Sequence, residues 1–303
     1  MFDARPLTRR RFLGTSLSLA GCAVPLLAAD RPAWLNDLAV NAFGLRAHLI
    51  ADFAGTLQRL RAIGYRRLEL VSFSGWDGDP YGSFTALAAM SGEAVAATLS
   101  AAGLRSTSAH VRPRELGPDT LEKTVQWMAP IGISTLVAAG LPNPAEGIDA
   151  MLRSIDGLNE TGHRVASHGL KLMLHGDFAL WQPYGRARLF DEFARRVDPA
   201  LCKLQLDLGA TLQMSVNAVD VLLHYGRYVN SVHLRDGMPP FDPAVYVPSV
   251  PLGTGVAPIP QIVHAALNVG VSDFVVEMVM RPEGRELEAL TSSYLYLHHL
   301  RSA

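Results

Sequence analysis

Short apolar runs alternate with longer stretches of helical periodicity along most of the chain. Within residues 53–63, for example, apolar side chains recur at Phe53, Leu57, Leu60 and Ile63, which is the spacing of one face of a helix. The shorter runs are rich in aliphatic and β-branched residues, which is typical of strands. They predict strands over residues 38–43, 67–73, 104–111, 134–139, 170–175, 202–207, 228–233 and 273–277.

Helices are expected between these strands, over residues 53–63, 91–102, 118–128, 145–168, 187–196, 216–225, 258–267 and 283–300. Eight strands that alternate with helices predict an α/β fold, a parallel (β/α)8 or TIM barrel. The chain has 303 residues, 49% of them hydrophobic, and a barrel of about 250 residues fits once a short leader is set aside. Because no linker rich in Pro, Gly or Ser interrupts the pattern, residues 30–303 are expected to form a single domain.

The first 29 residues have the pattern of an export signal. Residues 8–14 read Thr-Arg-Arg-Arg-Phe-Leu-Gly, the twin-arginine form, and residues 15–29 follow without a charge. This apolar stretch is shorter than the ~20 residues of a membrane span, so no span is expected. Cleavage is expected either before Cys22, where Leu-Ala-Gly-Cys resembles a lipobox and would give a lipid anchor, or after Ala29. The protein is therefore expected in the periplasm or otherwise exported, as a lipoprotein in the first case.

The charge balance argues against a nucleic-acid partner, and the cysteine content argues against a disulfide. Lys and Arg total 27 against 28 for Asp and Glu, so the formal charge is -1, and no basic field favours nucleic acid. Cys202 is the single cysteine beyond the leader, so no disulfide is expected in the mature domain. Nothing in the pattern indicates an oligomeric state.

Three of the expected strands end in side chains that commonly bind metals. The runs 204–207, 229–233 and 274–277 close with Asp207, His233 and Glu277 respectively. In a (β/α)8 barrel the carboxyl ends of the strands meet at one face, where active sites lie. One Asp, one His and one Glu so placed predict a divalent-metal site.

Several motifs in the second half resemble the xylose-isomerase-like barrel superfamily, and within it the sugar phosphate isomerase/epimerase branch. They are Gly-Leu-Lys-Leu-Met-Leu-His-Gly-Asp-Phe at 169–178, Leu-Gln-Leu-Asp-Leu-Gly at 204–209, His-Leu-Arg-Asp-Gly at 233–237, Leu-Gly-Thr-Gly at 252–255 and Val-Val-Glu at 275–277. Their order and spacing carry the resemblance, which extends from about Leu38 to the C-terminus.

The resemblance implies a divalent ion at the barrel mouth, held by His175, Asp207, His233 and Glu277. Imidazole and carboxylate ligands suit Mn2+, Co2+, Zn2+ or Fe2+. Such an ion would polarise a carbonyl or stabilise an enediolate while a neighbouring base moves a proton. Glu277, Asp177 and His110 are the catalytic candidates; Glu69, Trp76, Trp181, Arg281 and Asp236 are the candidates for substrate binding, and Asp236 could also orient His233.

The chain departs from this family at strand five. Family epimerases usually end that strand with a Glu that is both ligand and base, whereas His175 stands here, with Asp177 two positions later. This favours proton abstraction from one side of the substrate, as in aldose–ketose isomerisation or β-elimination beside a keto group. We therefore expect an exported, metal-dependent isomerase or lyase acting on a small carbohydrate.

Other interpretations stay open. Within enzymes the alternative is a ketose epimerase, and outside them a non-catalytic carbohydrate-binding barrel; an endonuclease at abasic sites is disfavoured by the charge balance. For individual residues, Asp207 could cap a helix, His233 could be a buried core imidazole, and His175 could contact substrate instead of metal. Trp76 and Trp181 could pack in loops, and Arg281 could face solvent.

Overall fold

The computed structural model describes residues 32–72, 84, 87–141, 146–280 and 283–300. The expected signal segment, the loop at 75–82 and the candidates Trp76 and Arg281 lie outside these residues. The barrel lies within the compact unit Pro32–Ala303.

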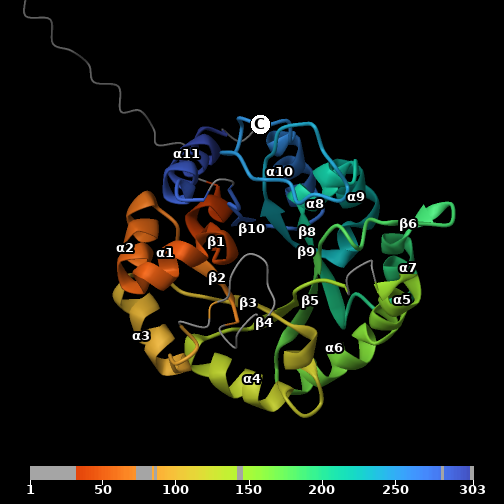
Figure 1. Ribbon diagram of the computed structural model, residues 1–303, viewed down its shortest axis with the longest axis horizontal. Helices are drawn as coiled ribbons and strands as arrows, with labels where there is room; N and C mark the ends of the chain where they lie inside the picture. Colours follow the sequence, from red (N-terminus) through yellow and green to blue (C-terminus); the bar gives the residue numbers. More distant parts are fainter. Residues whose placement is uncertain (1–31, 73–83, 85–86, 142–145, 281–282, 301–303) are drawn as a thin grey trace, which may run out of the picture. The chain divides into compact units, whose positions relative to one another are not determined.

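Eight parallel strands close into one barrel, as the alternating pattern predicts (Figure 1). Each strand pairs with the next in sequence, and the last returns to the first. They are β1 (Ala39–Asn41), β2 (Arg67–Val71), β3 (Ser108–Val111), β4 (Thr135–Ala138), β5 (Lys171–Gly176), β8 (Cys202–Asp207), β9 (Val229–Leu234) and β10 (Asp273–Val276). The predicted (β/α)8 architecture is confirmed.

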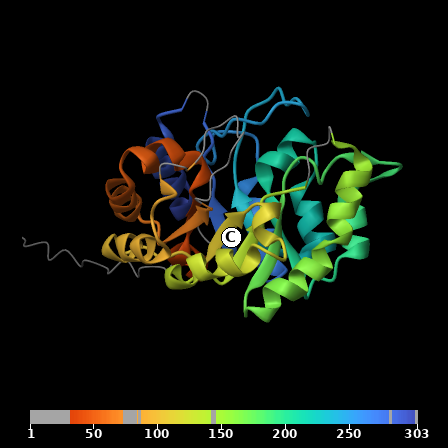
Figure 2. The same cartoon turned by 60° about the horizontal axis from the view of Figure 1, so that its bottom comes forward.

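Helices surround the strands on the outside (Figure 2). They are α1 (Arg46–Ala51), α2 (Phe53–Ile63), α3 (Gly92–Ala101), α4 (Leu121–Met128), α5 (Ile148–Asp156), α6 (Leu158–Ser167), α7 (Leu189–Arg196), α8 (Leu208–Gln213), α9 (Ala218–Tyr225), α10 (Ile259–Asn268) and α11 (Glu286–His299). Helix α2 has the predicted bounds, because Asp52 caps its first turn and Gly64 follows its last.

Local chemistry explains where the helices differ from expectation. The helix expected over 145–168 is divided at Gly157 into α5 and α6. The helix expected from Ala187 begins at Leu189, because Ala187–Arg188 (β7) pairs with Pro183–Tyr184 (β6) in a short hairpin. Helix α8 was not expected; it begins directly after Asp207, whose carboxylate accepts a hydrogen bond from the Gly209 backbone.

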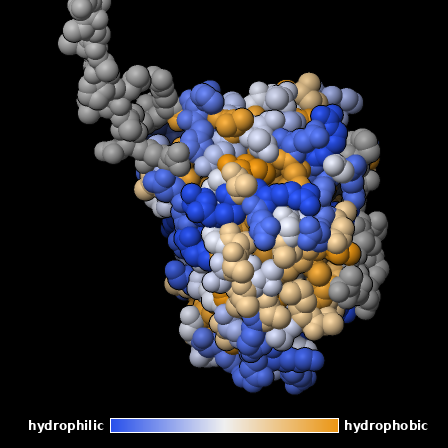
Figure 3. Space-filling model, turned by 90° about the vertical axis from the view of Figure 1, so that its left-hand side faces the viewer, coloured by the Kyte–Doolittle hydropathy of each residue, from blue (hydrophilic) through white to orange (hydrophobic). Residues whose placement is uncertain are grey.

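The core has two layers, one inside the barrel and one between strands and helices. All five residues of β2 are buried, which is typical of a parallel strand covered on both faces. Helix α2 turns Leu57 and Leu60 inward, both fully buried. The outer surface on this side, over α2 and α3, mixes hydrophilic and apolar residues (Figure 3). Among the described residues, no helix is both long and apolar enough to cross a membrane.

Candidate metal centre

The four expected ligands lie together at the carboxyl end of the barrel. Asp207 is the last residue of β8 and is paired in register with His233, the fifth of the six residues of β9. His175 is the fifth of the six residues of β5, and Glu277 directly follows β10. Since parallel strands end at one face, their side chains converge there.

Three of these side chains carry buried polar atoms without a hydrogen-bond partner. The atoms are His175 Nε2, His233 Nδ1 and Glu277 Oε2. Each of these three residues also offers one ligand atom within 4.8 Å of those of the other two. His233 Nδ1 is 3.4 Å from Glu277 Oε2, and His175 Nε2 is 3.6 Å from Asp207 Oδ2. Ligands bonded at about 2.0–2.2 Å to one ion are separated by about 3.0–3.6 Å. The residues present therefore fit a divalent cation.

The two carboxylate oxygens of Asp207 make different contacts. Oδ1 accepts the 2.7 Å hydrogen bond from the Gly209 backbone that caps α8. Oδ2 faces His175 and accepts a 2.9 Å hydrogen bond from Arg235 Nη1. One oxygen thus fixes the side chain, and the other points toward the ligand cluster.

Arg235 is the important site residue that sequence reasoning missed. Its side chain is 2% exposed, donates to Asp207, and carries Nε 3.5 Å from Glu277 Oε2. Another bond goes to the Val247 carbonyl at 2.7 Å. Although burial raises the pKa of Glu277, Arg235 and His233 lower it to about 2. The signal was available in the sequence, because Arg235 follows His233 by two positions and so leaves the strand on the same face.

Glycine makes room for this buried cation. A Cβ at Gly209 would lie 2.3 Å from Arg235 Cζ. The residue that Asp207 binds when it caps α8 must therefore be small, and the cap and the ion pair form one packed unit.

A polar network adjoins the ligand cluster inside the barrel. Glu69, only 1% exposed, accepts hydrogen bonds from His233 Nε2 at 2.6 Å and from Gln205 Nε2 at 2.8 Å. His110 Nε2 lies 2.8 Å from Gln205 Oε1 and 3.2 Å from Glu69 Oε1. Glu69, His110 and His233 also lie close enough to hold an ion, but the short hydrogen bond between Glu69 and His233 already uses the atoms concerned. Side chains of the protein already donate hydrogen bonds to both carboxylate oxygens of Glu69. This does not agree with the expected contact between Glu69 and substrate.

Asp177 lies just beyond β5, partly buried. Its Oδ1 accepts a 3.0 Å hydrogen bond from the Ala179 backbone, and a Cβ at Gly140 would lie 2.2 Å from its Oδ2. Burial raises the pKa of Asp177 to about 7, and the charge of Asp207 adds to the rise. A carboxyl group with this pKa can gain or lose a proton near neutral pH.

Two further expectations do not agree with the structure. Trp181 is 1% exposed, packs on Phe190 with ring centroids 4.8 Å apart, and donates from Nε1 to the Gly176 carbonyl. It is a core residue and has no free face for a sugar. Asp236 is equally buried and does not orient His233; its carboxylate binds the backbone N–H groups of four residues in the segment after β9, namely Gly237, Gly253, Gly255 and Ala257.

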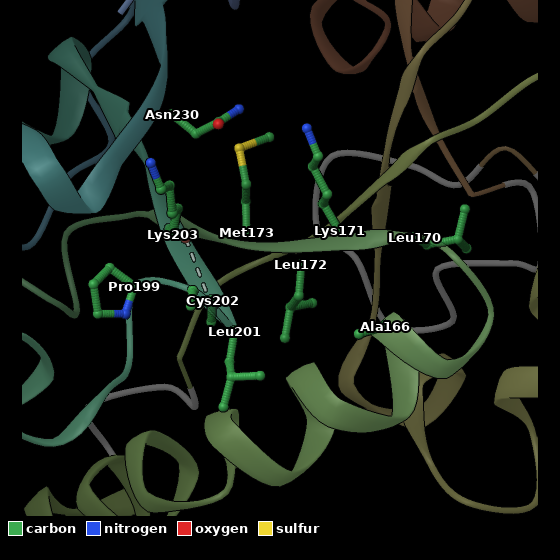
Figure 4. A pocket seen from close by; sticks show the side chains of 11 residues that line it. Ala166, Leu170, Lys171, Leu172, Met173, Pro199, Leu201, Cys202, Lys203 and Asn230 are labelled. Carbon is green, nitrogen blue, oxygen red and sulfur yellow. Dashed lines mark hydrogen bonds between the residues drawn. The ribbon is translucent and has the colours of Figure 1, made fainter. Parts of the chain in front are cut away.

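A cavity of about 270 Å³ lies at the opposite, amino-terminal ends of β5, β8 and β9 (Figure 4). Lys171, Lys203 and Asn230 line it together with apolar side chains, and none of the candidate ligands does. The amino-terminal face of such barrels contributes mainly to stability. We therefore place the chemistry at the carboxyl end.

Comparison with solved structures shows the same fold elsewhere. A sugar phosphate isomerase/epimerase from Parabacteroides distasonis superposes with a TM-score of 0.70 at 20% identity, over 87% of this chain and 96% of the other. A xylose isomerase-like barrel protein from Mycobacterium smegmatis in complex with magnesium gives 0.60 at 19% identity, over 87% and 96%. The probable 3-DHS dehydratase AsbF from Bacillus anthracis gives 0.64 at 14% identity, over 86% and 98%.

No curated protein sequence matches this chain significantly. The profile of one family, however, matches residues 57–293, a range that begins in α2, ends in α11 and includes all four expected ligands. With most of the chain matched and the closed barrel in place, the chain belongs to the xylose isomerase-like TIM barrel family.

Proposed function

We propose that the protein is a divalent-metal-dependent isomerase or lyase that removes a proton next to the carbonyl group of a carbohydrate. The observation that carries this proposal is the convergence of His175, His233 and Glu277 beside Asp207, each of the three with a buried ligand-type atom that makes no hydrogen bond. When bound, a divalent ion would act as a Lewis acid toward the carbonyl oxygen. The likeness to an isomerase/epimerase and to a dehydratase, and the magnesium in a third relative, agree with this chemistry.

Asp177 is the proposed base. Its pKa of about 7, raised mainly by burial, suits proton transfer at neutral pH. Glu277 is a weaker candidate, because Arg235 and His233 outweigh burial and hold its pKa at about 2. A carboxylate of that pKa is a poor proton acceptor and a good ligand, so we assign Glu277 to the ion and Asp177 to the substrate.

A ketose epimerase is the second candidate. That reaction needs two groups on opposite faces of the substrate carbon, one that accepts a proton and one that donates a proton. His110 is the residue that favours it. Its Nε2 lies 2.8 Å from Gln205 Oε1, which accepts a hydrogen bond, so the neutral ring has its lone pair on Nδ1. If Asp177 and His110 flanked one carbon, the proton could leave on one face and return on the other.

Metal analysis and hydrogen exchange test this proposal together. The purified protein is loaded with Mn2+, Co2+, Zn2+ or Fe2+ and incubated in D2O with free ketoses, aldoses and keto-glycosides. We expect one carbon-bound hydrogen of a substrate to exchange with deuterium. The product then identifies the reaction as isomerisation, elimination or inversion. The variant His233→Ala should lose metal, and Asp177→Asn should keep metal but lose exchange by about 10²- to 10⁴-fold.

A matched control and two contrary results complete the design. His264→Ala removes an exposed imidazole on α10, outside the site, and should change neither the metal content nor the rate of hydrogen exchange. A wild-type protein that holds no divalent ion would refute the metal site. A protein that holds metal and binds sugars but exchanges no hydrogen would support the carbohydrate-binding alternative.

We also propose that the protein acts after export. The twin-arginine pattern at 8–14 and the uncharged stretch at 15–29 support this. An exported enzyme would meet free sugars or glycosides more often than phosphorylated ones. The candidate substrates are therefore limited to sugars without a phosphate group. Replacing Arg9 and Arg10 with Lys should abolish periplasmic recovery of the expressed chain, and Cys22→Ala should release it from membranes only if a lipid is attached.

A further inference from the structure

Glu69 is a buried carboxylate with an unusually complete set of donors. Its Oε1 accepts from Asn41 Nδ2 at 2.9 Å and from His233 Nε2 at 2.6 Å. Its Oε2 accepts from Ser108 Oγ and Gln205 Nε2, both at 2.8 Å. Four side chains from β1, β3, β8 and β9 therefore surround one buried carboxylate.

These donors keep the carboxylate ionised and in one orientation. Asn41 and Gln205 donate from amide groups, which have no acceptor to offer at these nitrogens, so both carboxylate oxygens of Glu69 act as acceptors. The Gln205 amide is itself oriented, because its Oε1 faces His110 Nε2 and its Nε2 also donates to Ser231 Oγ at 3.1 Å. Gln205 thus presents a donor to Glu69 and cannot turn over without losing these contacts.

The contact with Glu69 determines which ring nitrogen of His233 carries a hydrogen. A carboxylate 2.6 Å from Nε2 requires a hydrogen on that nitrogen. Neutral imidazole then has its lone pair on Nδ1, the atom that is 3.4 Å from Glu277 Oε2 and without a hydrogen-bond partner. The ring position is fixed as well, since the whole side chain of His233 is fully buried.

We infer that Glu69 is a positioning residue that acts through His233: it holds the ring so that Nδ1, which carries the lone pair once the imidazole is neutral, faces His175 and Glu277. The inference rests on the proposed metal site. It assigns Glu69 to the support of a ligand, in place of the substrate contact expected from sequence. Carboxylate–imidazole pairs of this kind fix the tautomer of ligating histidines and raise their basicity.

Metal affinity provides the first test. Dissociation constants for Zn2+ and Co2+ are measured by chelator competition on the full domain. Glu69→Gln keeps the shape but removes the charge, and it should weaken binding about 10- to 100-fold. Ser108→Ala is the matched comparison, because it removes one donor from the same carboxylate but leaves its charge and the other three donors, and it should weaken binding less than Glu69→Gln does. Equal affinity in Glu69→Gln and wild type would overturn the inference.

Nitrogen-15 NMR of labelled histidine provides the second test. In the zinc-loaded wild type, His233 should show a protonated Nε2 with a slowly exchanging, far-downfield proton, and Glu69→Gln should lose that signature. Glu69→Asp, which keeps the charge but shortens the side chain, should restore part of the affinity if Glu69→Gln folds poorly. A protonated Nδ1 with a bare Nε2 in the wild type would contradict the inference.

The two proposals can fail separately. If the wild type binds neither ion, the proposed metal centre fails. The hydrogen bond between His233 Nε2 and Glu69 does not need a metal, so its proton is still read by NMR in the same protein. If NMR detects this proton in a protein that binds no metal, the Glu69–His233 hydrogen bond only stabilises the fold. That result would overturn the role of Glu69 in positioning a metal ligand.

Discussion

Replacing Arg235 with Met would test how the protein holds two carboxylates together without a metal. The guanidinium lies 2.9 Å from Asp207 and 3.5 Å from Glu277, and all three side chains are at most 4% exposed. Removing one member of a buried ion pair costs about 3–5 kcal/mol, because the remaining charge is left in a region of low dielectric. At about 2–4 °C per kcal/mol, the melting temperature of the metal-free protein should fall by roughly 6–20 °C.

Thermal denaturation in EDTA and in excess Mn2+ measures this effect. The loss should be smaller with metal, because a bound cation replaces the missing charge. Arg285→Met is the control; its partner Glu288 is largely exposed, so no measurable change is expected. The double variant Arg235→Met, Asp207→Asn should recover part of the stability, since one unpaired charge is gone. If Arg235→Met and the wild type have the same melting temperature in EDTA, the guanidinium does not stabilise the site as argued.

Three further predictions concern single groups. Burial lowers the pKa of His233, but Glu69 and Glu277 raise it to about 10, so the metal-free ring holds a proton on Nδ1 at pH 7 that metal must displace. Metal binding should then release about one proton and tighten as pH rises toward 10; calorimetry in buffers of different ionisation enthalpy measures this, and a binding enthalpy independent of buffer would contradict it. Gly140→Ala should displace the Asp177 carboxylate, which a Cβ would approach to 2.2 Å, and cut turnover while metal content stays unchanged. Burial raises the pKa of Cys202 to about 12, so a thiol reagent at pH 8 should label it only after unfolding; rapid labelling of the native protein would refute this.

Residues at strand ends were the most predictable part of the site. His175, Asp207, His233 and Glu277 each follow a short apolar run, and the barrel brings them to one face. Asp207 also caps α8, so the two interpretations of that residue from sequence do not exclude one another. The helix expected over 145–168 was less accurate, since a helical pattern continues across Gly157 while the chain breaks there.

Residues whose role depends on contacts across the barrel were not predictable in the same way. Trp181 lies in a segment that resembles an exposed loop, yet it packs into the core against Phe190. Asp236 follows His233 closely in sequence, but its carboxylate turns to the backbone of residues up to 21 positions away. In both cases a neighbour distant in sequence decides the direction of the side chain.

By itself the sequence determined the order of strands and helices, the closed α/β barrel and the convergence of four strand-end residues at one face, because these follow from local periodicity and from the rule that parallel strands share one open face. Only the tertiary structure decided which charges meet. Arg235 joins Asp207 and Glu277, and Glu69 sets the proton on His233, across distances of 28 to 164 positions in the chain. Electrostatic interactions act through space and are strong between buried groups, and the spacing of residues in the sequence does not indicate those distances.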